Sequence, residues 1–218
     1  MNEKEFCFII CSNNDFYLGE CLHYIRSLIV PDGYSVDVLT VSGAKSMTAG
    51  YNEAMECSKA KYKVYLHQDT FIINPHFIRD CLEVFLSDER IGMLGNIGAK
   101  KLPDSGIMWE TDRNGMVYEQ HIYETVLAGK RKADNGNEVI DVEVVDGFLM
   151  VTQYDIRWRE DLFDQWDFYD CSQSMEFTRK GYRVVVPIMT VPWCVHDCGF
   201  VNLERYDDER KKFVEEYL

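Results

Sequence analysis

Basic residues are scarce in this sequence. Of its 218 residues, 23 are Lys or Arg and 37 are Asp or Glu, so the formal net charge is -14 at pH 7. Affinity for nucleic acids comes largely from clustered Lys and Arg, and this composition therefore argues against a protein that binds phosphate backbones. An anionic ligand would need local stabilisation, from a metal ion or from a helix N-terminus.

The sequence also lacks a long apolar run. Its start, MNEKEFCFII, is charged and then briefly apolar, without the apolar core or cleavage site of a signal peptide. We therefore expect no transmembrane segment and a cytoplasmic location, with peripheral contact at the inner membrane face as an alternative. No internal repeat or linker divides the chain, and 46% hydrophobic residues suffice for one core, so we expect a single domain over residues 1–218.

A Cys-x-x-Cys pair that could complete a tetrahedral zinc site is missing. Cys194 and Cys198 flank His196 in WCVHDCG, which raises zinc as an alternative, but further ligands at the required spacing are absent. Most of the other cysteines lie within strand-like or helical patterns of a chain too long to need disulfides. We expect reduced thiols that pack as small apolar side chains.

Strands and helices alternate in the first half of the chain. Short apolar runs that end in polar residues indicate strands, and apolar residues that recur every three or four positions indicate helices. The pattern predicts strands at 5–12, 35–41, 91–98 and up to His67, and helices at 15–29, 47–58 and from Asn74 to about Phe85. Such alternation predicts a Rossmann-like α/β fold with a mainly parallel central sheet and helices on both faces.

The alternation breaks from about Lys100 to Asn137, where Gly, Asp, Asn and Lys are frequent. We expect an insertion or flap at 100–137 that is less ordered without ligand, with a two-stranded piece near GMVYEQHIYETVL. The remaining chain predicts a strand at 138–152, a helix at 171–182, a strand at 183–187 and a charged terminal helix from about Leu203.

Polar side chains follow three of the predicted strands. They are Ser12-Asn13-Asn14, His67-Gln68-Asp69 and the pair Asp146-Gly147. In open α/β sheets, ligands bind outside the carboxyl ends of the strands, so these residues are the first candidates for a site. A carboxylate held by a rigid sheet, such as that of Asp69, can bind a divalent cation that neutralises a phosphate ligand. Alternatively, Asp69 caps the turn into the next helix.

Several stretches resemble family 2 glycosyltransferases with the GT-A fold. KVYLHQDTFI is similar to the strand that ends in that family's Asp-x-Asp metal motif, and SMTAGYNEAMECSKA is similar to the Gly- and Asn-containing helix before it. WREDLFDQWDFYDCSQSMEFTRKGYRVVVP resembles the stretch that carries Phe-Asp-Glu, Glu-Asp and a helix ending in Gly-Tyr. WCVHDCG matches the position of a late His, and the His-Gln-Asp variant resembles a bacterial branch of the family.

The resemblance implies a role for each matching residue. Asp69 matches the carboxylate that binds the metal on the donor diphosphate, His196 matches the late His that completes the metal shell, and Asp170 matches the catalytic base. The resemblance further implies that the nucleotide-sugar is contacted by Ser12, Asn13, Asn14, Ser42, Asn52, His67 and Gln68. It also implies a sugar or acceptor pocket formed by Asp146, Gly147, Trp166 and Tyr169.

The sequence departs from the family pattern at three positions. His67 replaces the first Asp of Asp-x-Asp, and Tyr169 replaces the Glu of Glu-Asp. Ser42 follows the second strand, where many relatives have an acidic residue that contacts the base or ribose. Metal affinity and nucleotide preference therefore stay open, although Asp69 and Asp170, which have the more direct chemical roles, are present.

The chemistry of sugar transfer requires groups of this kind. Leaving phosphates need charge stabilisation by a divalent cation, for which oxygen ligands suit Mg²⁺ and an added imidazole favours Mn²⁺. The attacking hydroxyl needs a carboxylate that removes its proton, and the aromatic residues Trp166, Phe168 and Tyr169 would give Asp170 a partly buried site. As an alternative, Asp170 is only the N-cap of the helix that follows.

We therefore predict a metal-dependent, inverting, hexosyltransferase-like glycosyltransferase that uses Mn²⁺ or Mg²⁺. The expected donor is a nucleotide-diphosphate sugar, a UDP-sugar first, and the expected acceptor is a glycan or glycolipid in bacterial surface glycan or glycoconjugate synthesis. Two other classes are alternatives. One is a catalytically silent module of the same fold that binds nucleotide-sugars or glycans. The other is a nucleotidyltransferase, which would need a Gly- and basic-rich loop that the stretch 11–14 lacks.

Overall fold

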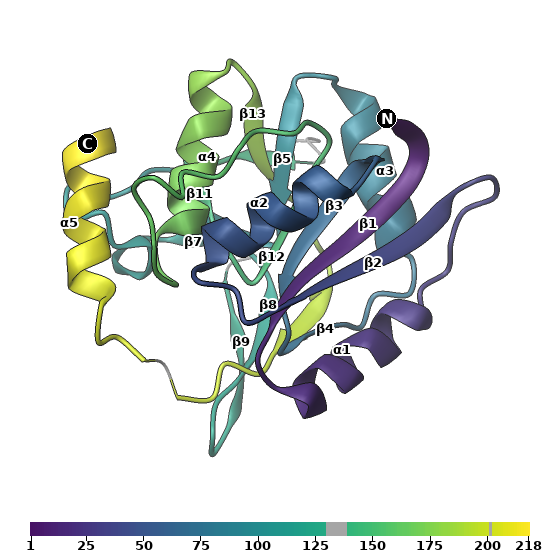
Figure 1. Cartoon of the computed structure of the whole chain (residues 1–218), viewed down its shortest axis with the longest axis horizontal. Helices are drawn as coiled ribbons and strands as arrows, with labels where there is room; N and C mark the ends of the chain where they lie inside the picture. Colours follow the sequence, from purple (N-terminus) through teal and green to yellow (C-terminus); the bar gives the residue numbers. More distant parts are fainter. Residues whose placement is uncertain (130–138, 201) are drawn as a thin grey trace.

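A seven-stranded sheet forms the centre of the molecule. The computed structural model describes residues 1–129, 139–200 and 202–218, and Figure 1 shows the sheet with helices packed around it. In spatial order the strands are β10 (Val139–Asp141), β13 (Arg183–Pro187), β5 (Ile91–Gly95), β12 (Leu149–Thr152), β3 (Ala60–His67), β1 (Asn2–Ser12) and β2 (Ser35–Ser42).

Most of these strands run in one direction. β1 pairs in parallel with β2 and with β3, and β5 pairs in parallel with β13. β12 is antiparallel to both β3 and β5, and β10 is antiparallel to β13 at the edge of the sheet. Five strands, β1, β2, β3, β5 and β13, therefore share one direction, which confirms the predicted mainly parallel sheet.

Helices cover both faces of the sheet. Side chains alternate along β1, so Phe8 and Cys11 point to opposite faces. The ring of Phe8 lies 6.3 Å from that of Phe77 in α3 (Phe77–Ser87), measured between centroids. Cys11 lies beneath Gly50 of α2 (Met47–Cys57), where a Cβ would approach the Cys11 sulfur to 2.5 Å. Figure 1 shows α2 in front of the strands and α3 behind them.

The other predicted helices are present with shifted ends. α1 (Asp15–Arg26) ends three residues earlier than predicted, α4 (Tyr169–Arg179) begins two residues earlier, and α5 (Tyr206–Tyr217) begins three residues later. Phe168 occupies the N-cap position of α4 in a left-handed backbone conformation, with φ of 56°. Asp170 therefore lies inside the first turn of α4, and the expectation that it is the N-cap residue is wrong.

Two small sheets lie beside the central one. The first contains β4 (Thr70–Ile72), β14 (Cys194–His196), β8 (Val117–Gln120) and β9 (Thr125–Ala128). The second contains β11 (Val144–Val145), β6 (Ile97–Ala99) and β7 (Arg113–Gly115), with a 3-10 turn at Met108–Glu110 before β7. β8 and β9 pair antiparallel, which confirms the predicted two-stranded piece.

Two predicted strands are each divided between sheets, so their predicted bounds are wrong. The run 91–98 splits at Asn96 into β5 and β6, and the buried Asn96 amide donates a hydrogen bond to the carbonyl of Met116 (2.8 Å). The run 138–152 splits into β10, β11 and β12, of which β11 belongs to the three-stranded sheet. A continuous apolar run gives no sign of the point at which a chain leaves one sheet for another.

The segment predicted to be a flap is paired in the part that can be described. Between residues 100 and 129, β7 pairs with β6, and β8 pairs with both β14 and β9. Residues 130–137 lie outside the described residues, and a flap over the site stays a prediction. All eight cysteines are free thiols, as expected. Within residues 1–129, 139–200 and 202–218, no helix is long and apolar enough to cross a membrane.

Candidate active site

The carboxyl ends of β1, β2 and β3 border a pocket. Parallel pairing brings Ser12, at the end of β1, beside Ser42 of β2, and places Cys11 beside His67 of β3. The pocket is lined by the ends of these strands, the loop before α2, the turn after β3 and one distant tryptophan: Cys11, Ser12, Asn13, Val41, Gly43, Ala44, Met47, His67, Gln68, Asp69 and Trp166. It lies at the sheet edge where the sequence predicts a ligand site.

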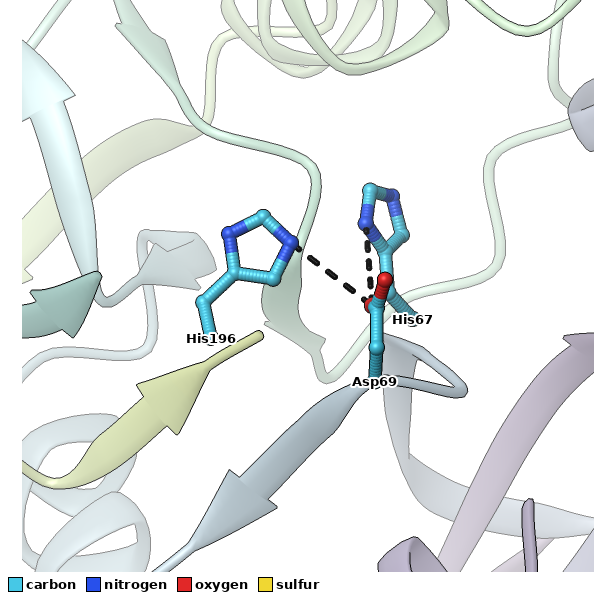
Figure 2. Close-up of side chains that lie close together, drawn as sticks. All are labelled: His67, Asp69 and His196. Atoms are coloured by element: carbon cyan, nitrogen blue, oxygen red, sulfur yellow. Dashed lines mark ion pairs between the residues drawn. The ribbon is translucent and has the colours of Figure 1, made fainter. Parts of the chain in front are cut away.

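Three side chains at this edge could hold a metal ion. One ligand atom from each of His67, Asp69 and His196 lies within 4.8 Å of the other two. Figure 2 shows both imidazoles around the Asp69 carboxylate, whose Oδ1 lies 3.6 Å from Nε2 of His196 and 3.9 Å from Nδ1 of His67. His196 reaches this position because β14 pairs antiparallel with β4, which sets it opposite Thr70. The structure thus brings together two residues 127 positions apart, Asp69 and His196.

The electrostatics of this group suit a cation. Burial, with smaller effects of His67 and His121, holds the pKa of His196 well below its usual range, so its imidazole is neutral near pH 7 and has a free lone pair. Burial also raises the pKa of Asp69, against the opposing effect of His67. Within the described part of the chain, the buried Oδ1 of Asp69 has no hydrogen-bond partner. A bound cation would satisfy this oxygen, so the donor set fits Mn²⁺ or Mg²⁺.

Asp69 does not cap the helix that follows it. α3 begins only at Phe77, with His76 at the N-cap position, and β4 intervenes. The carbonyl of Asp69 instead accepts a hydrogen bond from the N–H of Asp197 (2.9 Å), which ties the turn after β3 to the segment after β14. The capping alternative for Asp69 is therefore wrong, and its side chain is free for a ligand role.

Gln68 organises the loop between β1 and α1. Its Oε1 accepts hydrogen bonds from the Ser12 hydroxyl (2.9 Å) and from the backbone N–H groups of Asn13 (3.0 Å) and Asn14 (2.9 Å). Its Nε2 donates to Oδ1 of Asn13 (2.7 Å). The Asn14 side chain caps α1 by accepting hydrogen bonds from the N–H groups of Phe16 and Tyr17. Gln68 and Asn14 thus shape the pocket by bonding to the protein itself.

A second pocket adjoins the first and shares His67 and Trp166 with it. Its walls come from the 3-10 turn before β7, the loop that leads into α4, and the start of α5: His67, Gly106, Met108, Trp109, Asp146, Trp166, Asp167, Phe168, Tyr169, Asp170, Cys171 and Tyr206. Because the two pockets meet at the same two residues, ligands in them would lie against each other beside the metal-binding group.

Asp170 is the most unusual acid of this second pocket. Burial, reinforced by the charge of nearby Asp146, raises the pKa of Asp170 to about 7. Its Oδ2 accepts a hydrogen bond from the N–H of Gly147 (2.8 Å), and its Oδ1 accepts one from the N–H of Cys171 (2.7 Å). Each oxygen keeps a second lone pair, and a carboxyl with a pKa near the working pH can exchange a proton with a substrate.

Tyr169 lines the second pocket and contacts His67, which lines both pockets. It is buried, and its hydroxyl lies 2.5 Å from Nε2 of His67. The ring packs against Tyr51 and Trp158, at centroid distances of 5.9 and 6.1 Å. The hydroxyl also lies against Gly147, where a Cβ would approach it to 2.1 Å. Tyr169 therefore occupies a fixed position between the possible metal ligand His67 and the strand-end turn at Gly147.

We expect Gly147→Ala to destabilise the protein by about 1–3 kcal/mol, the usual cost of overpacking a core. The new methyl group cannot be accommodated, because Tyr169 is held by the aromatic residues around it. Thermal unfolding should show a lower Tm.

Gly19→Ala in α1 is the matched control, because no heavy atom lies within 4 Å of its Cβ position. This control should be stabilised by about 0.5–1 kcal/mol. A Gly147→Ala protein as stable as the parent would contradict the close packing of Tyr169 against this turn.

Two residues expected at the nucleotide, Asn52 and Ser42, line neither pocket, and the side chain of a third, Asn14, caps α1 instead. Asn52 is buried in α2, where its Nδ2 donates to the carbonyl of Trp158 (3.0 Å) and to Oε2 of Glu160 (2.9 Å), and its Oδ1 accepts from the N–H of Trp158 (2.9 Å). It lines neither pocket, and Ser42 lines neither, although Val41 and Gly43 beside it line the first. None of these three side chains enters our proposal below.

Several residues that line the two pockets could not be identified as site residues from the sequence. Trp109 and Tyr206 reach the second pocket from segments far apart in the chain, and their rings lie 4.9 Å apart. Met47 and Ala44 line the first pocket from the start of α2 and the loop before it. Trp109 is 53% exposed, and its place on a pocket wall can be recognised only once the fold is known.

The comparisons with known proteins agree with this geometry. A model of a glycosyltransferase-like family matches residues 7–217, nearly the whole chain. A comparison with curated proteins finds no match.

Solved glycosyltransferases share the fold at low sequence identity. The mannosyltransferase PcManGT from Pyrobaculum calidifontis, in complex with GDP-Man and Mn²⁺, is 11% identical with a TM-score of 0.62, over 99% of this chain and 64% of that one. S. aureus TarS with UDP is 12% identical with a TM-score of 0.54, over 94% and 63%.

GalNAc-T7 with UDP, GalNAc and Mn²⁺ is a third similar structure. It is 10% identical with a TM-score of 0.60, over 91% of this chain and 44% of its own. The chain thus spans less than two thirds of each of these structures, and the likeness supports a GT-A fold.

Proposed function

Because this chain belongs to the glycosyltransferase-like family, we propose that it transfers a sugar from a nucleotide-diphosphate donor to a hydroxyl group, with inversion and with the help of a divalent cation. The observation that carries the proposal is the arrangement of the two pockets. His67 and Asp69 of the metal-binding group line the first, Asp170 lines the second, and the pockets meet at His67 and Trp166. A donor diphosphate and an acceptor hydroxyl would then meet at this junction.

Asp69 and His196 would hold the cation, Mn²⁺ or Mg²⁺. When bound, such a cation neutralises charge on the leaving diphosphate. The protein supplies little positive charge of its own there, since no Lys or Arg is among the described residues that line the two pockets. The loop fixed by Gln68 would receive the nucleotide, with Ser12 and Asn13 on the wall of the pocket.

Asp170 would act as the base of the transfer. Its carboxylate would take the proton of the acceptor hydroxyl while that oxygen forms a bond to the anomeric carbon and the bond to the diphosphate breaks. A single displacement of this kind, with one base and one leaving group on opposite sides, inverts the anomeric centre. Asp146, Trp166 and Tyr169, which line the second pocket, would form the sugar and acceptor site together with Gly147, which lies against Tyr169. The exposed ring of Trp166 is available for stacking on a sugar face.

The choice of donor and acceptor completes the proposal. A UDP-sugar is the expected donor, and a glycan or glycolipid of bacterial surface glycan or glycoconjugate synthesis is the expected acceptor. The likeness to TarS with UDP and GalNAc-T7 with UDP supports a uridine donor, whereas the likeness to PcManGT with GDP-Man supports a guanosine donor. A cytoplasmic location, with contact at the inner membrane face as the alternative, is part of the same proposal.

Release of free nucleotide tests the proposal directly. The protein is incubated with UDP- and GDP-sugars and Mn²⁺, and nucleotide release is measured with and without a chelator. Metal-dependent release from one donor class is expected. Saturable donor binding without release from any donor, even with glycan acceptors, would instead favour a catalytically silent binding module of the same fold.

We expect Asp146→Asn to move the pH profile of transfer to lower pH. The base must be ionised, so kcat/KM should rise with pH through the pKa of Asp170, which is about 7. The charge of Asp146 contributes to that raised pKa, and its removal lowers the pKa. The variant should therefore keep more of its maximal kcat/KM at pH 6 than the parent protein does.

Asp164→Asn is the matched control for this shift. It also removes one negative charge, from the loop that leads into α4, but Asp164 pairs with Lys212 (2.9 Å) and lines neither pocket. Its pH profile should match that of the parent. An Asp146→Asn profile that also matches the parent would argue against Asp170 as the titrating base.

A further inference from the structure

His67 stands where its two ring nitrogens face different partners. Nδ1 faces Oδ1 of Asp69 at 3.9 Å, within the group that could hold a metal ion. Nε2 lies 2.5 Å from the hydroxyl of Tyr169. An imidazole can bind a metal only through an unprotonated nitrogen, so Nδ1 is available when the ring proton is on Nε2.

The Tyr169 hydroxyl is placed to accept a hydrogen bond from the Nε2–H of His67. It is buried within the aromatic cluster and backed by Gly147, so it cannot turn away without moving the ring. Metal-binding histidines commonly donate their other N–H to such a partner, which fixes both the tautomer and the ring orientation. Tyr169 would act here as a positioning residue that touches no metal itself.

We propose that Tyr169 holds His67 with Nδ1 toward the cation, which makes His67 the third protein ligand beside Asp69 and His196 and makes the site select Mn²⁺ over Mg²⁺. This inference rests on the metal site of the proposed function and adds its ligand set and its selectivity. The selectivity follows from the donor atoms: two imidazole nitrogens and one carboxylate oxygen suit Mn²⁺, whereas Mg²⁺ prefers oxygen ligands throughout.

The charge of the site leads to one more expectation. The three ligands carry a single negative charge when both imidazoles are neutral, so the protein alone should bind a divalent cation weakly. A diphosphate adds negative oxygen ligands, and Mn²⁺ should therefore bind more tightly with UDP than without it. Mn²⁺ with UDP is accordingly the probe for the experiments that follow.

Tyr169→Phe tests the positioning role by metal binding, without turnover. Free Mn²⁺ is measured by electron paramagnetic resonance while the folded variant, with UDP present, is titrated. Loss of the hydroxyl leaves the Nε2–H of His67 without its partner, and we expect Mn²⁺ affinity to fall ~10- to 100-fold.

Tyr51→Phe is the matched control. Tyr51 belongs to the same aromatic cluster, but its buried hydroxyl has no hydrogen-bond partner among the residues described. This variant should bind Mn²⁺ like the parent. Equal, undiminished affinity in Tyr169→Phe and Tyr51→Phe would overturn the positioning role of Tyr169.

His67→Asp tests the selectivity on its own. The substitution replaces an imidazole with a carboxylate, and we expect the preference for Mn²⁺ over Mg²⁺, measured by competition in the presence of UDP, to fall by ~10-fold. An unchanged Mn²⁺-to-Mg²⁺ ratio in the folded variant would show that His67 is no ligand and would overturn the inference.

These measurements are separate from the test of transfer. If the protein released no nucleotide from any donor but bound Mn²⁺ selectively and through His67, the proposed enzymatic function would fail while the inferred ligand set held. If transfer occurred but Mg²⁺ bound as well as Mn²⁺, the selectivity would fail while the proposed function held.

Discussion

Asp170→Asn should bind the donor normally yet lose the transfer step by ~10²- to 10⁴-fold, the usual effect of removing a positioned general base. Donor binding should persist because the diphosphate would be held at the metal-binding group, of which Asp69 lines the neighbouring pocket. The measurements are the rate of sugar transfer at saturating donor and acceptor, and the donor dissociation constant of the same protein.

The fold of the variant is checked by its pH-dependent stability. In the folded parent protein the Asp170 carboxyl has a pKa of about 7, raised mainly by burial, whereas in the unfolded chain it has its ordinary pKa of ~4. The unfolded state thus releases this proton first, and the parent protein loses stability as pH rises from about 4 to 7. Asn cannot ionise, so the Tm difference between variant and parent should shift in favour of the variant as pH rises from about 4 to 7.

Asp170→Asn has one structural cost, the loss of a buried hydrogen bond to the backbone. The two carboxylate oxygens of Asp170 accept backbone hydrogen bonds from Gly147 and Cys171, and an Asn side chain offers only one such oxygen. Loss of one buried bond costs about 1–3 kcal/mol, which lowers Tm at acidic pH without unfolding the protein. A folded Asp170→Asn protein with undiminished transfer would reject the role of base and leave Asp170 as a residue that only fixes the turn at Gly147.

The first half of the fold was predictable because its signals are local. The apolar run of β1, the polar residues after it and the three-to-four-residue period of α1 each lie within one short window. The same reasoning failed at Asn96 and near Asp141, where the chain passes between sheets within a strand-like run. Sheet membership depends on pairing with distant strands, and one strand's own residues do not encode it.

The site was predictable only in part, for a related reason. Asp69 and Asp170 follow recognisable patterns, but the function of Gln68 as a clamp on the loop at 12–14 depends on the register between β1 and β3. Asn52 looked like a ligand-binding residue, yet its amide bonds to Trp158 and Glu160, more than a hundred positions away. The partner of a polar side chain is a property of the fold, so sequence identifies candidates and structure assigns them.

Asp69→Ala should abolish the cation-dependent stabilisation of the protein by nucleotide. A ligand that binds only the folded state at 100 times its dissociation constant adds about 2.7 kcal/mol, or roughly 5–10 °C in Tm for a chain of this size. The parent should show a shift of this order with UDP and Mn²⁺. The variant should show none, because Asp69 is the only carboxylate of the metal-binding group found among the described residues.

Loss of this shift would not reflect misfolding, because burial of the Asp69 carboxylate opposes the ligand-free fold more than the neighbouring His67 favours it. Its Oδ1 is buried without a partner in the described structure, and burial raises its pKa, so removal of the group should leave the Tm without ligand equal or higher. Asp164→Ala, at a surface ion pair with Lys212, is the control and should keep the full Mn²⁺-dependent shift. An Asp69→Ala protein that also kept the shift would place the cation elsewhere and remove the basis of the proposed metal site.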